Sequence, residues 1–162
     1  MPRSEREQLK LTKTARGYPV NPQLPRMPMT PPPQLPSVLI VDDDADFCES
    51  AFDCFDDKGF DVNATLDAIT ALHLARTGEY DVAVIDRYMP GVDGISLFLQ
   101  MQARHPPIQG ILVTGADTDG TDRLARDAGF AHILYKPLDF KELLQTVEGV
   151  GNGQPVDSWR EP

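Results

Sequence analysis

Several acidic or polar positions in this sequence come directly after short apolar runs, and their side chains could hold a metal ion and a phosphoryl group. Carboxylates crowded into one site stay ionised together only beside a cation, and a site of oxygen atoms favours Mg²⁺ or a similar hard ion. A carboxylate can also attack phosphorus, while a hydroxyl and an ammonium group can neutralise charge on the transferring group. The positions concerned are Asp42, Asp43, Asp44, Asp86, Thr114 and Lys136.

An alternation of strand and helix patterns would bring these side chains together. Short strand-like runs predict strands at residues 37–41, 60–64, 81–85, 108–113 and 131–135, and residues 38–41 and 82–85 are continuously apolar, as in strands buried on both faces. The intervening stretches predict helices at residues 46–58, 67–77, 94–104, 119–128 and 139–148. Strand–helix units in this order predict an α/β fold with a doubly wound, five-stranded parallel sheet covered on both faces. Because ligands bind at the carboxyl ends of such strands, the polar positions are expected to meet in one crevice.

Glycines and aspartates mark the ends of the predicted helices. Asp44 and Asp46 are interpreted as the cap and first-turn acid of the first helix rather than as ligands. Left-handed residues that end helices are predicted at Gly59, Gly78 and Gly129, and N-caps at Asp67, Asp119 and Asp139.

The chain divides into three parts by composition. Residues 1–36 hold nine of the 15 prolines and six Lys or Arg against two Glu, which predicts a disordered, basic, Pro-rich tail. Residues 37–149 are the predicted folded domain, and residues 150–162 a flexible C-terminal tail. The whole chain carries a net charge of −10 and the first 36 residues +4, so the rest carries −14. A charge this acidic argues against nucleic-acid binding by the folded part.

The sequence shows no membrane or metal-cysteine pattern. No apolar run approaches the roughly 20 residues that a membrane span needs, and the N-terminus lacks the apolar stretch of a secretory signal. We therefore expect a cytoplasmic protein with no membrane partner. Cys48 and Cys54 are interpreted as reduced thiols near a helix surface, because their spacing suits neither a metal site nor a disulfide. His73, His105 and His132 match no ligand spacing and are interpreted as structural or surface groups.

Residues 37–149 resemble the receiver domain of two-component response regulators, of the stand-alone, single-domain type. The matching motifs are the acidic pair after the first strand, the segment DRYMPGVDG at residues 86–94, Thr114 with Gly115, and Lys136 with the proline that follows it. They occur in the order and approximate spacing typical of the family. The resemblance implies the flavodoxin-like strand order 2-1-3-4-5 and a function in phosphorelay signal transduction. It implies no enzyme activity beyond self-phosphorylation and self-dephosphorylation.

The resemblance also assigns roles to the acidic residues. Asp86 would be the phosphoacceptor, taking a phosphoryl group from a phosphohistidine on a sensor histidine kinase or a phosphotransfer protein. Asp43 would bind Mg²⁺ directly, and Asp42 directly or through water. Asp86 would add a third carboxylate, and the backbone carbonyl of Tyr88 would be a further ligand.

The remaining family positions concern the phosphoryl group and the switch. Thr114 and Lys136 would contact phosphoryl oxygens, and the bond from Lys136 to the next proline resembles one that is often cis in the family. The position three before Lys136 is often an aromatic residue that moves together with Thr114, but here it is Ile133. Tyr135 is a candidate substitute on the same strand face. Tyr88 lies two residues past the acceptor, where its bulk is expected to slow hydrolysis of the acyl phosphate.

The expected readout is a protein surface. Too few residues follow the last predicted helix for a helix-turn-helix module. A downstream protein is therefore expected to bind the face formed by residues 119–149, whose conformation the phosphoryl group would shift.

Three other interpretations of the sequence compete with this one. A calcium loop beginning at Asp42 is excluded, because its sixth position is Phe47 and its twelfth is Asp53. A phosphatase resembling the haloacid dehalogenases would use the early acidic pair, a later Thr and a Lys, but it needs a second acidic pair that this chain lacks. An interaction or scaffold module that recruits a partner through the Pro-rich tail remains an alternative.

Overall fold

A computed structural model of the chain describes residues 34–115 and 120–154. Most of the predicted N-terminal tail, the predicted cap Asp119 and most of the predicted C-terminal tail lie outside these residues. Within them the chain forms one parallel sheet of five strands, a short hairpin and five helices.

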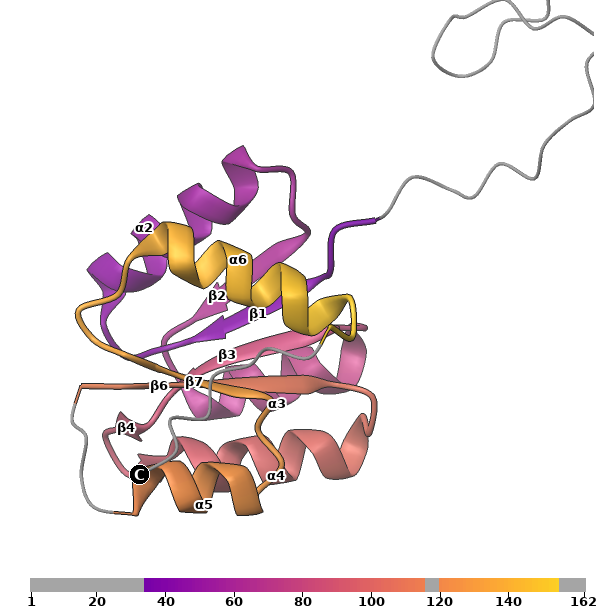
Figure 1. Cartoon of the computed structure of the whole chain (residues 1–162). Helices are drawn as coiled ribbons and strands as arrows, with labels where there is room; N and C mark the ends of the chain where they lie inside the picture. Colours follow the sequence, from indigo (N-terminus) through magenta and orange to yellow (C-terminus); the bar gives the residue numbers. More distant parts are fainter. Residues whose placement is uncertain (1–33, 116–119, 155–162) are drawn as a thin grey trace, which may run out of the picture. The chain divides into compact units, whose positions relative to one another are not determined.

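The sheet has the strand order β2-β1-β3-β6-β7, and every neighbouring pair is parallel (Figure 1). The predicted order 2-1-3-4-5 is therefore confirmed, since β4 and β5 belong to a separate two-stranded hairpin. The central strands are buried along their whole length, which explains their continuous apolar sequences. The strands are β1 (Val38–Val41), β2 (Val62–Thr65), β3 (Val82–Asp86), β6 (Gln109–Thr114) and β7 (His132–Tyr135).

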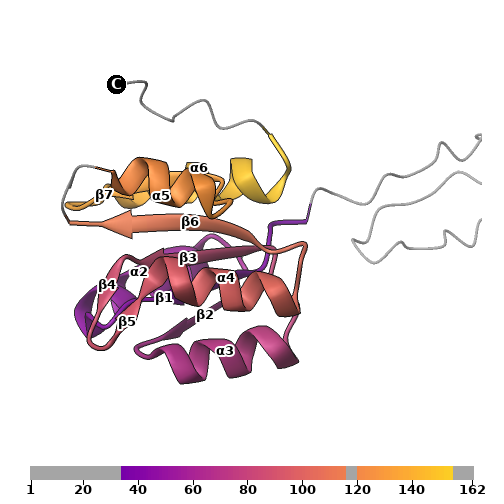
Figure 2. The same cartoon turned by 90° about the horizontal axis from the view of Figure 1, so that it is seen from below.

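Helices cover both faces of the sheet, as predicted (Figures 1 and 2). One apolar cluster joins side chains of α2 (Ala45–Asp57) and α6 (Phe140–Gly151) to one face. A second cluster joins α3 (Ala68–Thr77), α4 (Gly94–Arg104) and α5 (Thr121–Asp127) to the other. The sheet is thus the middle layer of three, and its strand ends are held by packing from both sides.

The caps account for most of the helix boundaries. Asp44, Asp67 and Asp139 accept hydrogen bonds from backbone N–H groups of α2, α3 and α6, so these N-caps are confirmed. The left-handed glycine predicted at Gly78 is wrong, because its φ is −111°. The last helix continues to Gly151 instead of ending at residue 148.

The start of α5 also differs from the prediction. This helix begins at Thr121 rather than at residue 119, after Gly120 in the left-handed region (φ 94°) and without a side-chain cap. It is therefore the shortest of the helices in the described residues, and its first turn depends on contacts with other elements.

A small hairpin that the sequence did not predict as strands follows the central strand directly. It consists of β4 (Tyr88–Met89) and β5 (Val92–Asp93), which pair antiparallel. Gly91 has φ 74° at its turn. The hairpin connects the end of β3 to the start of α4, where Asp93 accepts a hydrogen bond from the N–H of Ile95.

Cys48 was predicted near a helix surface, but it is buried between α2 and the sheet. Its thiol donates to the backbone oxygen of Asp42 at 3.2 Å, and burial, followed by the charge of Asp42, raises its pKa to about 11. Among the helices of the described residues, none is long and apolar enough to cross a membrane.

Candidate functional site

The strand ends bring the predicted site residues to one edge of the sheet. Asp42 follows β1, Asp86 is the last residue of β3, and Thr114 is the last residue of β6. Lys136 follows β7. The register pairs Val41 with Ile85 and so carries Asp42 and Asp86 forward on adjacent strands.

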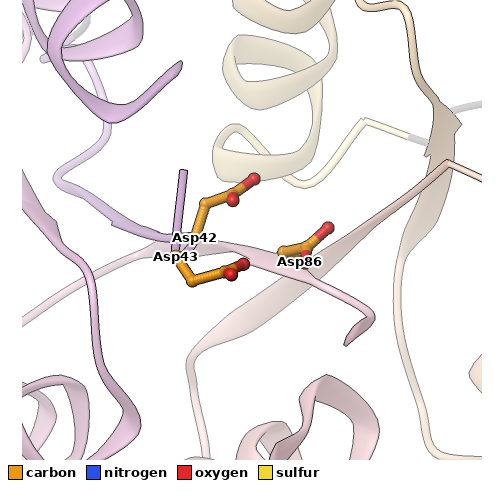
Figure 3. A group of neighbouring side chains, drawn as sticks. All are labelled: Asp42, Asp43 and Asp86. Atoms are coloured by element: carbon orange, nitrogen blue, oxygen red, sulfur yellow. The ribbon is translucent and has the colours of Figure 1, made fainter. Parts of the chain in front are cut away.

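Asp42, Asp43 and Asp86 form a compact acidic cluster (Figure 3). One carboxylate oxygen from each residue lies within 4.8 Å of the others. Asp42 and Asp86 are 1% and 7% exposed, whereas Asp43 is open to solvent. Such an all-oxygen set with one open side fits a hard divalent cation that keeps part of its water shell.

The two oxygens of Asp42 already have partners inside the protein. Oδ1 accepts the backbone N–H of Asp44 at 2.9 Å, and Oδ2 accepts from Nζ of Lys136 at 2.7 Å. Of the three residues, Asp43 therefore offers the most accessible oxygens. This arrangement agrees with direct binding of an ion by Asp43 and leaves both modes open for Asp42.

Lys136 supplies the positive charge that compensates the cluster. Its Nζ lies 2.7 Å from Asp42 Oδ2 and 3.3 Å from Asp86 Oδ1. Burial alone would lower the pKa of Lys136, but the hydrogen bond and charge of Asp42, with those of Asp86, raise it. Nζ also lies 5.1 Å from the ring centroid of Phe47, and the bond to Pro137 is cis, as the resemblance implied.

The pKa of Asp86 is raised. Burial is the largest cause and the charge of Asp42 the next, while Lys136 acts in the opposite direction. A carboxylate destabilised in this way gains from any cation that joins the site.

Comparison of the sequence with known protein families shows the family to which this chain belongs. Residues 38–148 match the response regulator receiver domain family. The chain belongs to the response regulator receiver family. The receiver fold and the receiver family inferred from the sequence are therefore confirmed, and the match does not support the phosphatase alternative.

Individual relatives of this receiver domain agree with the assignment. The transcriptional regulatory protein PrrA of Mycobacterium leprae is 33% identical over 116 residues, which are 71% of this chain and 49% of that protein. The sensor kinase CckA of Brucella abortus is 32% identical over 115 residues, 69% of this chain and 12% of that protein. This chain thus spans half or less of the length of these relatives. The receiver domain of the Francisella response regulator 1452 superposes with a TM-score of 0.68 at 30% identity, covering 73% of this chain and 98% of that one.

Ile133 and Tyr135, the two positions on β7 that the sequence related to a switch, have different surroundings. Ile133 is 5% exposed within the apolar cluster on the α3, α4 and α5 side. Tyr135 pairs with Thr114 in register, and its hydroxyl donates a hydrogen bond to Asp122 in the first turn of α5. Tyr135 therefore joins the end of β7 to α5.

The side chain of Thr114 is buried in this receiver, whereas that of Tyr88 is exposed to solvent. Thr114 is fully buried, and its backbone oxygen accepts the N–H of Lys136 at 2.8 Å. Tyr88 begins the hairpin with 56% of its surface exposed. The roles of Thr114, of Ile133 and of the Tyr88 carbonyl stay predictions.

Two residues beside the site were missed by the sequence reasoning. Phe47 stacks on Phe140, with ring centroids 6.0 Å apart, and presents its ring to Lys136. Arg87 is only 8% exposed although it carries a charge. The position of Arg87, directly after Asp86 in an otherwise buried strand end, was the signal that could have drawn attention to it.

Replacing Asp86 with asparagine is expected to stabilise the metal-free receiver at neutral pH, by about 1 kcal/mol, because one buried charge is removed. Since the pKa of Asp86 is raised above its ordinary 3.8, its protonated form stabilises the fold below that pH, and this contribution is lost as pH rises through the raised pKa. The gain in Asp86→Asn should therefore be present at pH 7.5 and shrink towards pH 4. Urea unfolding in the presence of EDTA at the two pH values measures it, and an unchanged or lower stability at pH 7.5 would contradict the electrostatic account.

Proposed function

We propose that this receiver accepts a phosphoryl group on Asp86 from a phosphohistidine of a sensor histidine kinase or a phosphotransfer protein. The observation that carries the proposal is the acidic cluster of Asp42, Asp43 and Asp86, in contact with the ammonium group of Lys136. A phosphoryl group attached to Asp86 would lie within reach of that lysine.

The site residues fit Mg²⁺ as the cofactor. Asp43 and Asp86 would hold the ion, with Asp42 directly or through water and the Tyr88 carbonyl as further ligands. A bound Mg²⁺ supplies positive charge that offsets the carboxylates and the phosphoryl oxygens.

The proposed transfer is a displacement at phosphorus. An oxygen of ionised Asp86 forms a bond to phosphorus, while the bond from phosphorus to the donor's imidazole nitrogen breaks and its electron pair stays on that nitrogen. Nζ of Lys136 lies 3.3 Å from Asp86 Oδ1, so it is close enough to stabilise negative charge that develops on the phosphoryl oxygens. Thr114 ends the neighbouring strand and would contact another of these oxygens.

Incubation with Mg²⁺ and acetyl phosphate tests this function. Intact-mass measurement should show the addition of one phosphoryl group to the wild type and none to Asp86→Asn. No addition to the wild type would overturn the proposal and favour the alternative of an interaction module that acts through the Pro-rich tail. Omission of Mg²⁺ should abolish the addition as well.

The proposed readout surface comprises α5, β7 and α6 and would bind a downstream protein. Leu124 on α5 is 51% exposed, and this helix has only seven residues and no side-chain cap. A helix with few buried contacts has a low free energy of local opening, so it changes conformation more easily than the rest of the domain. A phosphoryl group that favours one arrangement of this face would thus alter partner binding.

Tyr135→Phe is expected to loosen α5 in the unphosphorylated receiver. The substitution removes only the hydroxyl that donates to Asp122, at a cost of about 1 kcal/mol. Amide exchange of α5 measured by NMR should accelerate about fivefold, because exchange follows the free energy of local opening. Tyr80→Phe, at a buried tyrosine between α3 and β3, is the matched control and should leave α5 exchange unchanged. Equal exchange in Tyr135→Phe and the wild type would remove Tyr135 from the proposed switch.

A further inference from the structure

We propose that Arg87 is a positioning residue that holds the Tyr88 ring beside the acceptor and thereby lengthens the lifetime of the phosphoryl group on Asp86. The inference rests on the proposed function and goes beyond it by naming what controls the loss of the phosphoryl group. It is carried by the contacts of one buried guanidinium group.

The backbone of Arg87 is fixed at the junction between the acceptor strand and the hairpin. Its N–H donates to the backbone oxygen of Val113 at 2.7 Å, and its own oxygen accepts the N–H of Gly94 at 2.9 Å. The side chain is 9% exposed, which is rare for a residue that is always charged. Arg87 therefore moves only if the end of β3 moves with it.

The guanidinium group contacts both strands of the hairpin. Its Nη1 forms an ion pair with Asp93 Oδ1 at 3.3 Å, and its Cζ lies 5.2 Å from the centroid of the Tyr88 ring. Tyr88 and Asp93 are directly opposite each other in the hairpin register. One side chain thus fixes a cross-strand pair and, through Asp93, the start of α4, where Asp93 accepts from Ile95.

These contacts are unfavourable for the stability of the fold taken alone. Nε and Nη1 of Arg87 are buried without a well-directed hydrogen bond, so the ion pair with Asp93 is close but poorly oriented. Burying donors without partners is unfavourable, and replacing a buried ion pair by an apolar side chain is often neutral or stabilising. What Arg87 does supply is a fixed orientation for the first hairpin residue after the acceptor.

That orientation matters for hydrolysis of the acyl phosphate. In hydrolysis a water oxygen attacks phosphorus, the bond from phosphorus to the Asp86 oxygen breaks with its electron pair on the carboxylate, and inorganic phosphate leaves. Tyr88 is two residues past Asp86 and more than half exposed, and its ring contacts the Arg87 guanidinium. A cation above the face of a tyrosine ring restrains that ring. Loss of that contact would leave the ring free to move and the approach of water less restricted.

The experiment compares the loss of phosphate from four receivers: wild type, Arg87→Met, Tyr88→Leu and the double variant. Each is labelled with acetyl phosphate and Mg²⁺, freed of the donor, and followed by intact mass. Arg87→Met should lose the label about two- to tenfold faster than the wild type. Tyr88→Leu should do the same, and the double variant should be no faster than Tyr88→Leu.

Two further variants separate positioning from general damage. Arg87→Lys keeps the charge and should restore part of the lifetime, while Arg104→Met, on the exposed end of α4, should match the wild type. The thermal midpoint of Arg87→Met should be equal to or above that of the wild type. In unlabelled protein the NMR signals of the Tyr88 ring should shift in Arg87→Met but not in Arg104→Met.

The outcomes distinguish this inference from the proposed function. A wild type that accepts no label overturns both. A labelled wild type whose decay rate equals that of Arg87→Met overturns the inference alone. Additive acceleration in the double variant, or Tyr88 signals that do not shift in Arg87→Met, would also overturn it, because the effect would then not pass through the tyrosine ring.

Discussion

Replacing Gly94 with alanine is expected to destabilise the receiver by about 3 kcal/mol or more. A Cβ atom at this position would lie 2.1 Å from the backbone oxygen of Asp86 and 3.1 Å from Cγ2 of Ile85. Neither neighbour can give way, because one is backbone and the other is fully buried. Relief would require α4 to move away from the acceptor strand and would break the hydrogen bond from the Gly94 N–H to Arg87.

Urea unfolding of Gly94→Ala, compared with Gly115→Ala, measures this effect. A Cβ atom on Gly115 would meet no heavy atom of the described residues within 4 Å, so that variant should stay within about 0.5 kcal/mol of the wild type. Gly94→Ala should also accept less phosphoryl group, since the clash falls on the acceptor residue itself. Equal midpoints for the two variants would show that the helix start is not held against the acceptor.

Replacing Lys136 with methionine is expected to cost about 2–3 kcal/mol in the metal-free receiver. The ammonium group of the lysine contacts Asp42 and Asp86, both of which are almost fully buried. Without it these carboxylates face one another uncompensated. The cost is set at the lower end for a buried pair because the lysine side chain itself is 30% exposed.

Addition of Mg²⁺ should restore much of the stability of Lys136→Met. A ligand that binds only the folded state stabilises that state. In the variant no lysine ammonium group offsets the negative charges of Asp42 and Asp86, so Mg²⁺ takes over that role. Because the pKa of Lys136 is raised, its stabilising contribution is present below its ordinary 10.5 and lost as pH rises through the raised pKa. The difference from the wild type should thus persist from pH 7 to 9.

Lys141→Met is the control for Lys136→Met, since Lys141 is exposed on α6. Chemical unfolding with EDTA and with Mg²⁺ gives the four free energies needed. The increase in the free energy of unfolding on addition of Mg²⁺ should be larger in Lys136→Met than in Lys141→Met. An equal or smaller increase would contradict the view that the lysine and the ion compensate the same charges.

Sequence reasoning succeeded where local pattern and sheet geometry agree. Asp86 and Thr114 end buried apolar strands, and the parallel register then brings such ends together without any further information. Asp67 and Asp139 lie before apolar-periodic stretches, which is enough to specify an N-cap. The position of the site followed from these elements, whereas the roles came from the family motif.

The predictions from sequence were wrong or incomplete where tertiary contacts determine the local conformation. Gly78 follows a helix, but nothing in its sequence shows whether the chain leaves the helix in a left-handed or an extended conformation. Cys48 is buried because α2 turns that face to the sheet, a rotation that its alternating acidic and apolar residues specify only loosely. The contact of Arg87 with Tyr88 and Asp93 depends on a hairpin of two-residue strands, which is too short to carry a sequence pattern.

The most direct test of the account is to locate the phosphoryl group. After labelling with acetyl phosphate and Mg²⁺, borohydride reduction converts an acyl phosphate on aspartate to homoserine, which peptide mass spectrometry detects. The account predicts homoserine at position 86 and at no other aspartate, including Asp42 and Asp43. Reduction at another aspartate, or an unreduced Asp86 in protein that carries the label, would contradict the assignment of Asp86 as the acceptor.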